Sequence, residues 1–76
     1  MIQILTRPQC PACNATKRWL DQHGLTYSEH QLDAETIEWA RSQGHKQAPI
    51  VVFGETSFGG YSPTDLEALE AAIKKG

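Results

Sequence analysis

The sequence predicts an α/β fold in which a four-stranded mixed sheet is flanked on both faces by three helices. Short apolar or β-branched runs alternate with helix-like stretches, in the order βαβαββα. The 76 residues suffice for one modest core, so we expect a single domain over residues 1–76. The sequence contains no repeat, linker or low-complexity stretch that would divide this domain.

The first half of the chain has the pattern of strands that alternate with helices. Residues 1–6 predict a central strand that is buried on both faces, and a helix follows over residues 12–22. Residues 25–32 predict a second strand, which a right-handed crossover would place parallel to the first. Asp33 can cap a second helix over residues 34–43.

The second half predicts a hairpin and a final helix. Residues 48–53 contain a proline followed by strong β-formers, which indicates the third strand. Gly54-Glu55 suits a two-residue type II′ turn that leads into a return strand over residues 56–58. Ser62-Pro63 then supplies the cap and the first position of the last helix.

Composition narrows the class of partner and the compartment. The formal net charge is −2 and the longest basic cluster is Lys74-Lys75, so we expect no nucleic-acid partner. The apolar stretch at the N-terminus is too short for a signal peptide or a membrane span, so we expect a cytoplasmic protein without a membrane partner. Structural disulfides are rare in the cytoplasm, so a close cysteine pair there is more often catalytic or metal-binding.

Cys10 and Cys13 are the only cysteines, and they stand at the start of the first predicted helix. Two thiols at this spacing lie on one side of the helix, close enough to bond to each other. Unpaired N–H groups and the helix dipole favour a thiolate at Cys10, and Pro11 suits the first helical position. We therefore predict a redox-active disulfide in which Cys10 is an exposed nucleophile and Cys13, less exposed, resolves the mixed disulfide.

A zinc site is the alternative for these cysteines. Tetrahedral zinc takes about four ligands, whereas His23, His30 and His45 are scattered and a second CxxC is missing from the sequence. We therefore expect a monomer without a metal site. A dimer in which each subunit donates its CxxC pair is the zinc option that stays open, as part of a non-catalytic binding module.

The chain resembles the thioredoxin superfamily, in its glutaredoxin-sized form, over nearly its whole length. The resemblance rests on the CxxC after the first strand, on Pro49 before the third and on Gly59-Gly60 after the fourth. It implies a thioredoxin-like fold. It also implies a cis bond before Pro49, which would direct the Ala48 backbone towards an extended partner chain.

Several stretches are similar to the NrdH-redoxins, which are glutaredoxin-like in sequence but thioredoxin-like in use. This resemblance implies a small electron carrier that donates hydrogen to ribonucleotide reductase, is reduced by thioredoxin reductase and holds no bound cofactor. Phe58, Gly59 and Ala12 stand where that family usually has Trp, Ser and Gln. The similar stretches are Thr6-Arg7, residues 13–18, residues 44–51 and residues 58–63.

A glutathione-dependent glutaredoxin is the alternative within the superfamily. Such proteins resemble this chain in having a basic residue three positions before the first cysteine, here Arg7. Their Gly-Gly pair is followed by acidic residues that help to hold glutathione, whereas Tyr61-Ser62-Pro63 follows it here. In this alternative, glutathione would be the reductant.

The other candidate site residues are expected to surround the cysteines. Arg7 and Lys46 could place positive charge near Cys10, or they could be solvated surface residues. Phe58, on a short edge strand, and Tyr61 could face a partner or could be packed. The predicted partner-binding residues are Arg7, Pro11, Ala48, Pro49, Phe58, Gly59, Gly60 and Tyr61.

Overall fold

The computed structural model of the chain describes residues 2–75 and has the predicted order of elements. Met1, which the first predicted strand included, and Gly76 lie outside the described residues. The elements are β1 (Ile2–Thr6), α1 (Pro11–Gln22), β2 (Tyr27–Gln31), α2 (Ala34–Ser42), β3 (Ile50–Phe53), β4 (Thr56–Gly59) and α3 (Pro63–Lys75).

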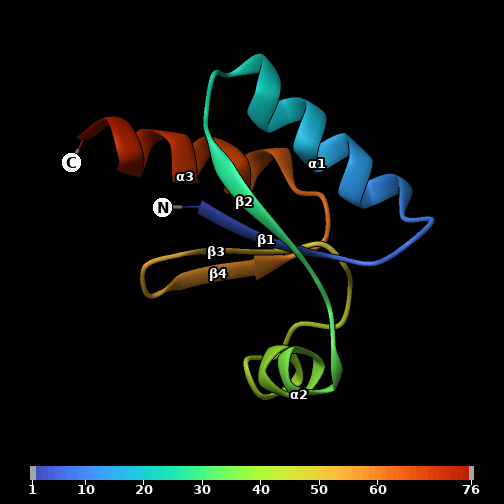
Figure 1. Ribbon diagram of the computed structural model, residues 1–76. Helices are drawn as coiled ribbons and strands as arrows, with labels where there is room; N and C mark the ends of the chain where they lie inside the picture. The colour runs from blue at the N-terminus through green and yellow to red at the C-terminus, as the bar shows by residue number, and fades with distance from the viewer. Residues whose placement is uncertain (1, 76) are drawn as a thin grey trace.

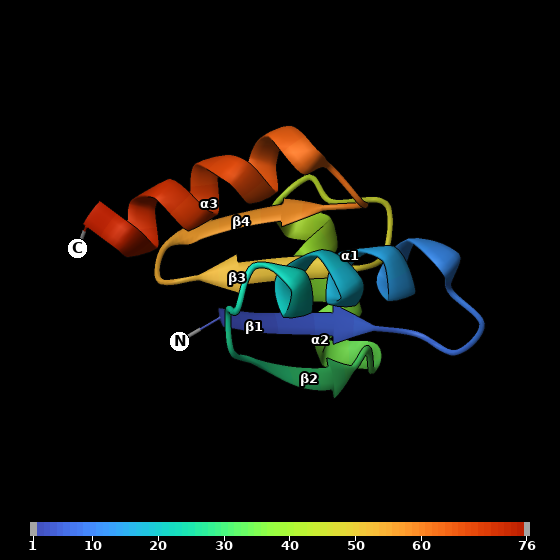
Figure 2. The same ribbon diagram turned by 90° about the horizontal axis from the view of Figure 1, so that it is seen from above.

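The four strands form one mixed sheet in the order β2-β1-β3-β4. β1 is parallel to β2 and antiparallel to β3, and β3 and β4 form an antiparallel hairpin. Helices α1 and α3 cover one face of the sheet and α2 covers the other (Figure 1). Seen from above, β1 runs towards the end of the sheet where a loop leads into α1 (Figure 2). The predicted thioredoxin-like architecture is confirmed.

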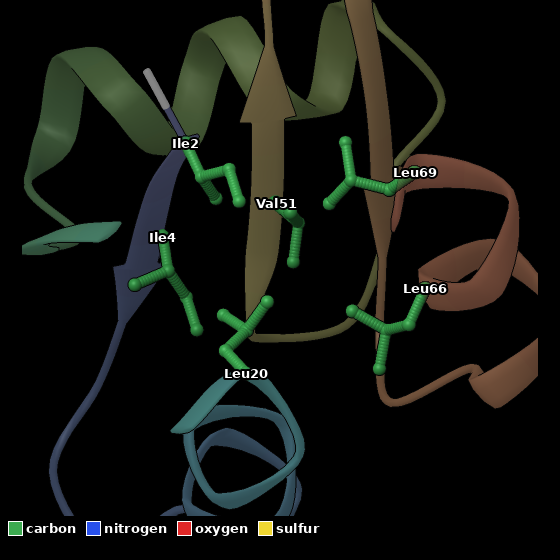
Figure 3. Close-up of a cluster of buried hydrophobic side chains, with 6 residues drawn as sticks. All are labelled: Ile2, Ile4, Leu20, Val51, Leu66 and Leu69. Atoms are coloured by element: carbon green, nitrogen blue, oxygen red, sulfur yellow. The ribbon is translucent and has the colours of Figure 1, made fainter. Parts of the chain in front are cut away.

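The core divides between the two faces because successive side chains of a strand point in opposite directions. Ile2 and Ile4 of β1 point towards α1 and α3, whereas Leu5 packs with Ala40 of α2 and with Ile50 on the other face. The larger cluster, on the face of α1 and α3, fixes both helices on the sheet (Figure 3). Its buried members are Ile2, Ile4, Leu20, Val51, Leu66 and Leu69.

Local sequence signals explain most of the element boundaries. Asp33 caps α2 by accepting a hydrogen bond from the Thr36 N–H at 2.8 Å, and the Thr36 hydroxyl accepts one from the Asp33 N–H at 2.7 Å. Gly54 has φ +60 in the β3–β4 turn, a value that glycine adopts readily. The Asp65 N–H donates to Ser62 Oγ at 3.4 Å, as expected for the cap of α3.

Three predicted strands need their bounds corrected. β2 is shorter than the predicted range of residues 25–32. β3 begins at Ile50 rather than at residue 48, because Pro49 has no N–H to donate to a strand ladder. β4 continues through Gly59, which pairs with Ile50, instead of ending at Phe58. In the described part of the chain, no helix combines the length and apolar character that crossing a membrane requires.

Candidate active site

Cys10 and Cys13 lie at the start of α1, after the loop that follows β1, at one end of the sheet. Cys10 is the N-cap of α1, with extended backbone angles, and Pro11 is the first residue of the helix, as predicted. The Cα atoms of the two cysteines are 5.2 Å apart and their sulfurs are at disulfide-bonding distance. The Cys13 N–H donates a hydrogen bond to Cys10 Sγ at 3.1 Å. A helix N–H therefore points at the sulfur that would carry the negative charge of a thiolate.

The exposure of Cys10 differs from the prediction. Cys10 retains 6% of its surface and Cys13 retains 2%, so both are buried, although Cys10 is the more accessible of the two. One reason is a segment far along the chain, because the carbonyl oxygen of Ala48 lies 3.9 Å from Cys10 Sγ. A reacting partner must therefore approach Cys10 closely over a small opening, from the side that this segment leaves free.

The loop before Cys10 has an unusual backbone. Gln9 has φ +54, in the left-handed region that residues other than glycine seldom adopt. Arg7, Pro8 and Gln9 are all exposed in this loop. The sequence carries no signal for this geometry, because Asn, Asp and Gly are the residues usually found there.

The segment before β3 lies beside Gly59 and Gly60, at the end of β4, and it contacts Cys10. The Ala48–Pro49 bond is cis, as the resemblance implied, and the Gly60 N–H donates to the Pro49 carbonyl at 2.8 Å. A Cβ added to Gly59 would stand 3.0 Å from the carbonyl oxygen of Gln47. The close approach of the two segments therefore depends on a residue without a side chain. Pro49 and Gly60 are buried, whereas Ala48 and Gly59 are partly exposed, so these two are the predicted residues of this group that a partner could contact.

The two aromatic candidates have different environments. Phe58 is half-buried and packs against the larger core cluster, which favours the packing alternative. Tyr61 is 43% exposed and follows directly after the buried Gly60. Of these two side chains, Tyr61 is therefore the one with substantial surface available to a partner.

A groove of about 580 Å³ extends from the segment at Ala48 to α2. We call it the cationic groove, because Arg7, Arg41 and Lys46 line it and its lining contains no carboxylate, although the chain has a net charge of −2. Its apolar lining includes Ala40 of α2. For Arg7 and Lys46 the sequence left open a place near Cys10 or on the solvated surface. Arg41 was not a candidate, because its place in the groove follows from how α2 packs on the sheet.

The histidines make contacts that do not resemble a metal centre. His23 Nδ1 lies 3.0 Å from Glu70 Oε2, and His45 Nε2 lies 2.8 Å from Ser57 Oγ. Within residues 2–75, His, Cys, Asp and Glu side chains form no group of three or more that could hold a metal ion.

Comparison with known proteins relates the whole arrangement to a family. The profile of the glutaredoxin family matches residues 2–58. The glutaredoxin-like protein NrdH of Escherichia coli K12 is 36% identical over 73 residues, which cover 93% of this chain and 90% of that protein. A glutaredoxin of Pseudomonas aeruginosa is 36% identical over 76 residues, or 96% of this chain and 88% of that protein. The solved structure of the E. coli NrdH-redoxin superposes with a TM-score of 0.82 at 36% identity, covering 90% of this chain and 92% of that one.

Proposed function

The chain belongs to the glutaredoxin family and is an NrdH-like thiol-disulfide oxidoreductase, and from this we propose that it carries electrons from thioredoxin reductase to ribonucleotide reductase. The E. coli NrdH-redoxin is described as having a thioredoxin-like activity profile, which supports thioredoxin reductase as the reductant here. The observation that carries the electron-carrier part of the proposal is the cap of α1, where the Cys13 N–H donates to the sulfur of Cys10; the choice of partners rests on the likeness to NrdH.

The proposed reaction is a pair of thiol–disulfide exchanges. The Cys10 thiolate attacks a disulfide of the partner, which forms a mixed disulfide and releases one partner sulfur as a thiolate. Cys13 then loses its proton and attacks Cys10 Sγ, which forms the intramolecular disulfide and releases the second partner thiol. The partner disulfide has gained two electrons and the Cys10–Cys13 pair has lost them. A reductase restores the pair by the reverse sequence, with electrons from NADPH.

The cap explains why Cys10 would be the attacking residue. A hydrogen bond from the Cys13 N–H, together with the positive end of the α1 dipole, stabilises a negative charge on Cys10 Sγ. Cys13 is the more deeply buried of the two, so a large partner meets Cys10 first. Cys13 lies about one turn further along α1, with its sulfur at bonding distance from Cys10 Sγ. It is therefore placed to attack the mixed disulfide that Cys10 has formed.

The cationic groove supports binding of a protein partner beside the reacting sulfur. Ala48 lines this groove and also contacts Cys10, so a segment that lies in the groove would bring its disulfide to the reactive end of α1. The positive charges of Arg41 and Lys46 favour a partner segment that carries carboxylates.

The same groove is the observation that favours glutathione as the alternative reductant. Glutathione is a small peptide with two carboxylates, and Arg7 and Lys46 could pair with them. Oxidised protein should be mixed with NADPH and either thioredoxin reductase or glutathione plus glutathione reductase. We expect NADPH consumption with thioredoxin reductase. Reduction by the glutathione route alone would overturn the proposal in favour of the alternative.

Variants of the two cysteines test their separate roles. Cys10→Ser should lose all disulfide reduction, because the nucleophile is missing. Cys13→Ser should accumulate a mixed disulfide with the partner, which intact-mass spectrometry can detect as an added mass that dithiothreitol removes. Disulfide reduction that survives in Cys10→Ser would contradict the assignment.

We further propose that the protein acts as a monomeric single domain without a resident metal. Size-exclusion chromatography with light scattering should give the mass of one chain. Metal analysis of freshly purified, reduced protein should give less than one zinc per two chains. A dimer that contains stoichiometric zinc would instead support the open alternative in which two CxxC pairs share one ion.

A further inference from the structure

A carboxylate on β2 joins the two segments that flank the cysteines. Thr6, the last residue of β1, donates its hydroxyl to Glu29 Oε2 at 2.9 Å. Lys17 of α1 donates to the same oxygen at 3.1 Å. By sequence, Thr6 stands four residues before Cys10, and Lys17 stands four residues after Cys13. Glu29 therefore contacts the chain on both sides of the redox motif.

The surroundings of this contact keep the carboxylate ionised. Thr6 is only 3% exposed, whereas the side chains of Glu29 and Lys17 are 41% and 27% exposed. The hydrogen bond from Thr6, followed by that from Lys17, lowers the pKa of the Glu29 carboxyl. Half-exposed ion pairs of this kind contribute little to stability, so the main consequence of this pair lies in its electrostatic effect on the neighbouring cysteines.

Lys17 is the cation of α1 that lies in line with the cysteines. Side chains four residues apart lie on the same side of a helix, so Lys17 follows Cys13 by one turn and Cys10 by about two. An unpaired ammonium at this position would stabilise a thiolate at the start of the helix. Glu29 largely cancels that effect, because its negative charge lies 3.1 Å from the ammonium.

We propose that Glu29 is a positioning residue for the cysteine chemistry: by holding and neutralising the Lys17 ammonium, it sets how readily Cys10 ionises. The inference deepens the proposed function and rests on Cys10 being the nucleophile, but not on the identity of the partner. The other titratable or charged side chains on the segments around the cysteines are unchanged in the test below. They are Arg7, Arg18, Asp21, Tyr27, His30, His45, Lys46, Tyr61 and Asp65, of which Asp21 and Tyr27 lie nearest to the Lys17–Glu29 pair.

The size of the effect follows from Coulomb's law. The helical rise places residue 17 roughly 10 Å from residue 10 along α1. One full charge at that distance in water-like surroundings shifts the pKa of a thiol by about 0.3 unit, and by more where the dielectric constant is lower. At a pH below the thiol pKa, a lowering by this amount makes alkylation about twofold faster, because the thiolate is the reacting form.

The test measures iodoacetamide alkylation of the reduced protein as a function of pH, which gives the thiol pKa of Cys10 without any partner. Glu29→Gln keeps an oxygen that can accept the Thr6 hydrogen bond and removes only the charge, so we expect a lower thiol pKa. Lys17→Met removes the cation and leaves the carboxylate, so we expect a higher one. The double variant should return close to the wild-type value, because the two charges are removed together.

Glu70→Gln is the matched control. Glu70 also bridges two partners, His23 at 3.0 Å and Lys74 at 3.4 Å, but it does so at the C-terminal end of α1. The Glu70→Gln substitution should leave the thiol pKa of Cys10 unchanged. Shifts of the same sign in Glu29→Gln and Lys17→Met, or a shift in Glu29→Gln no larger than in Glu70→Gln, would overturn the proposal.

Thermal unfolding of each reduced variant shows whether its thiol was measured in folded protein. Should Glu29→Gln fail to fold, Lys17→Met still tests the cation of the pair, because this side chain is only partly buried. A thiol pKa that does not rise in Lys17→Met would overturn the proposal. Since alkylation needs neither reductase nor disulfide substrate, this result does not depend on whether thioredoxin reductase or glutathione proves to be the reductant.

Discussion

Replacing Cys10 by alanine or by serine separates its structural contribution from its chemical one. The Cys10 side chain caps α1 by accepting the Cys13 N–H at 3.1 Å, at a buried position. Serine is a strong N-cap residue and can accept the same hydrogen bond, whereas alanine cannot. Both variants lack the nucleophile and cannot form the disulfide, so a comparison between them isolates the cap from the redox state.

The expected difference follows from the loss of one cap at a buried N–H. Loss of a cap costs about 0.5–2 kcal/mol, and a buried donor without a partner lies towards the upper part of that range. We therefore expect Cys10→Ala to be about 1–2 kcal/mol less stable than Cys10→Ser. For a domain of this size, that corresponds to a midpoint of thermal unfolding lower by roughly 4–15 °C.

The assay is urea and thermal unfolding of both variants, followed by circular dichroism. Asp33 provides a control, because it caps α2 through the Thr36 N–H at 2.8 Å. Asp33→Ala should be less stable than Asp33→Ser by about 1 kcal/mol, since this cap is exposed. Equal stabilities of Cys10→Ala and Cys10→Ser, beside a normal difference at Asp33, would show that the Cys13 N–H does not depend on residue 10. The explanation of a stabilised Cys10 thiolate would then lose its structural basis.

Three further predictions concern the groove, an ion pair and a glycine. Arg41→Glu should raise KM for a protein disulfide several-fold, with a smaller effect in high salt, whereas Arg18→Glu, outside the groove, should not. A hydrogen bond with His23, the C-cap of α1, lowers the pKa of the Glu70 carboxyl. The ionised carboxylate therefore stabilises the fold above pH 4.5, its ordinary pKa, and this stability is lost as the pH falls further. On acidification below that pH, the midpoint of thermal unfolding should therefore fall more steeply for the wild type than for Glu70→Gln. Gly59→Ala should cost about 1–3 kcal/mol in urea unfolding, because its Cβ would approach a backbone oxygen to 3.0 Å; a neutral result would contradict the described packing.

Much of the fold was predictable because its signals are local. Asp33 and Ser62 mark helix starts by their own hydrogen bonds, and Gly54 marks the hairpin turn by a backbone angle that glycine tolerates. The cap position of Cys10 is local as well, since its partner is Cys13, three residues away. The order of elements and the cysteine pair could therefore be predicted without any knowledge of the packing.

The surroundings of the site were harder to predict, because they join segments that are distant in the sequence. Burial of Cys10 involves Ala48, 38 residues further on, and the predicted exposure was wrong for that reason. Phe58 packs against the core because α3 folds over the sheet. No residue pattern indicates that Glu29 would lie beside Thr6 and Lys17, which come from two other elements.

The sequence by itself determined the order of strands and helices, the turn at Gly54 and the placing of two thiols on the first turn of a helix. Each of these depends on hydrogen bonds and backbone angles within a few neighbouring residues. Only the tertiary structure decided how far Cys10 is exposed, which cations line the groove and which carboxylate meets Lys17. Those properties depend on packing between elements, and a side chain's solvent access and electrostatic surroundings exist only once α1, α2 and the sheet have come together.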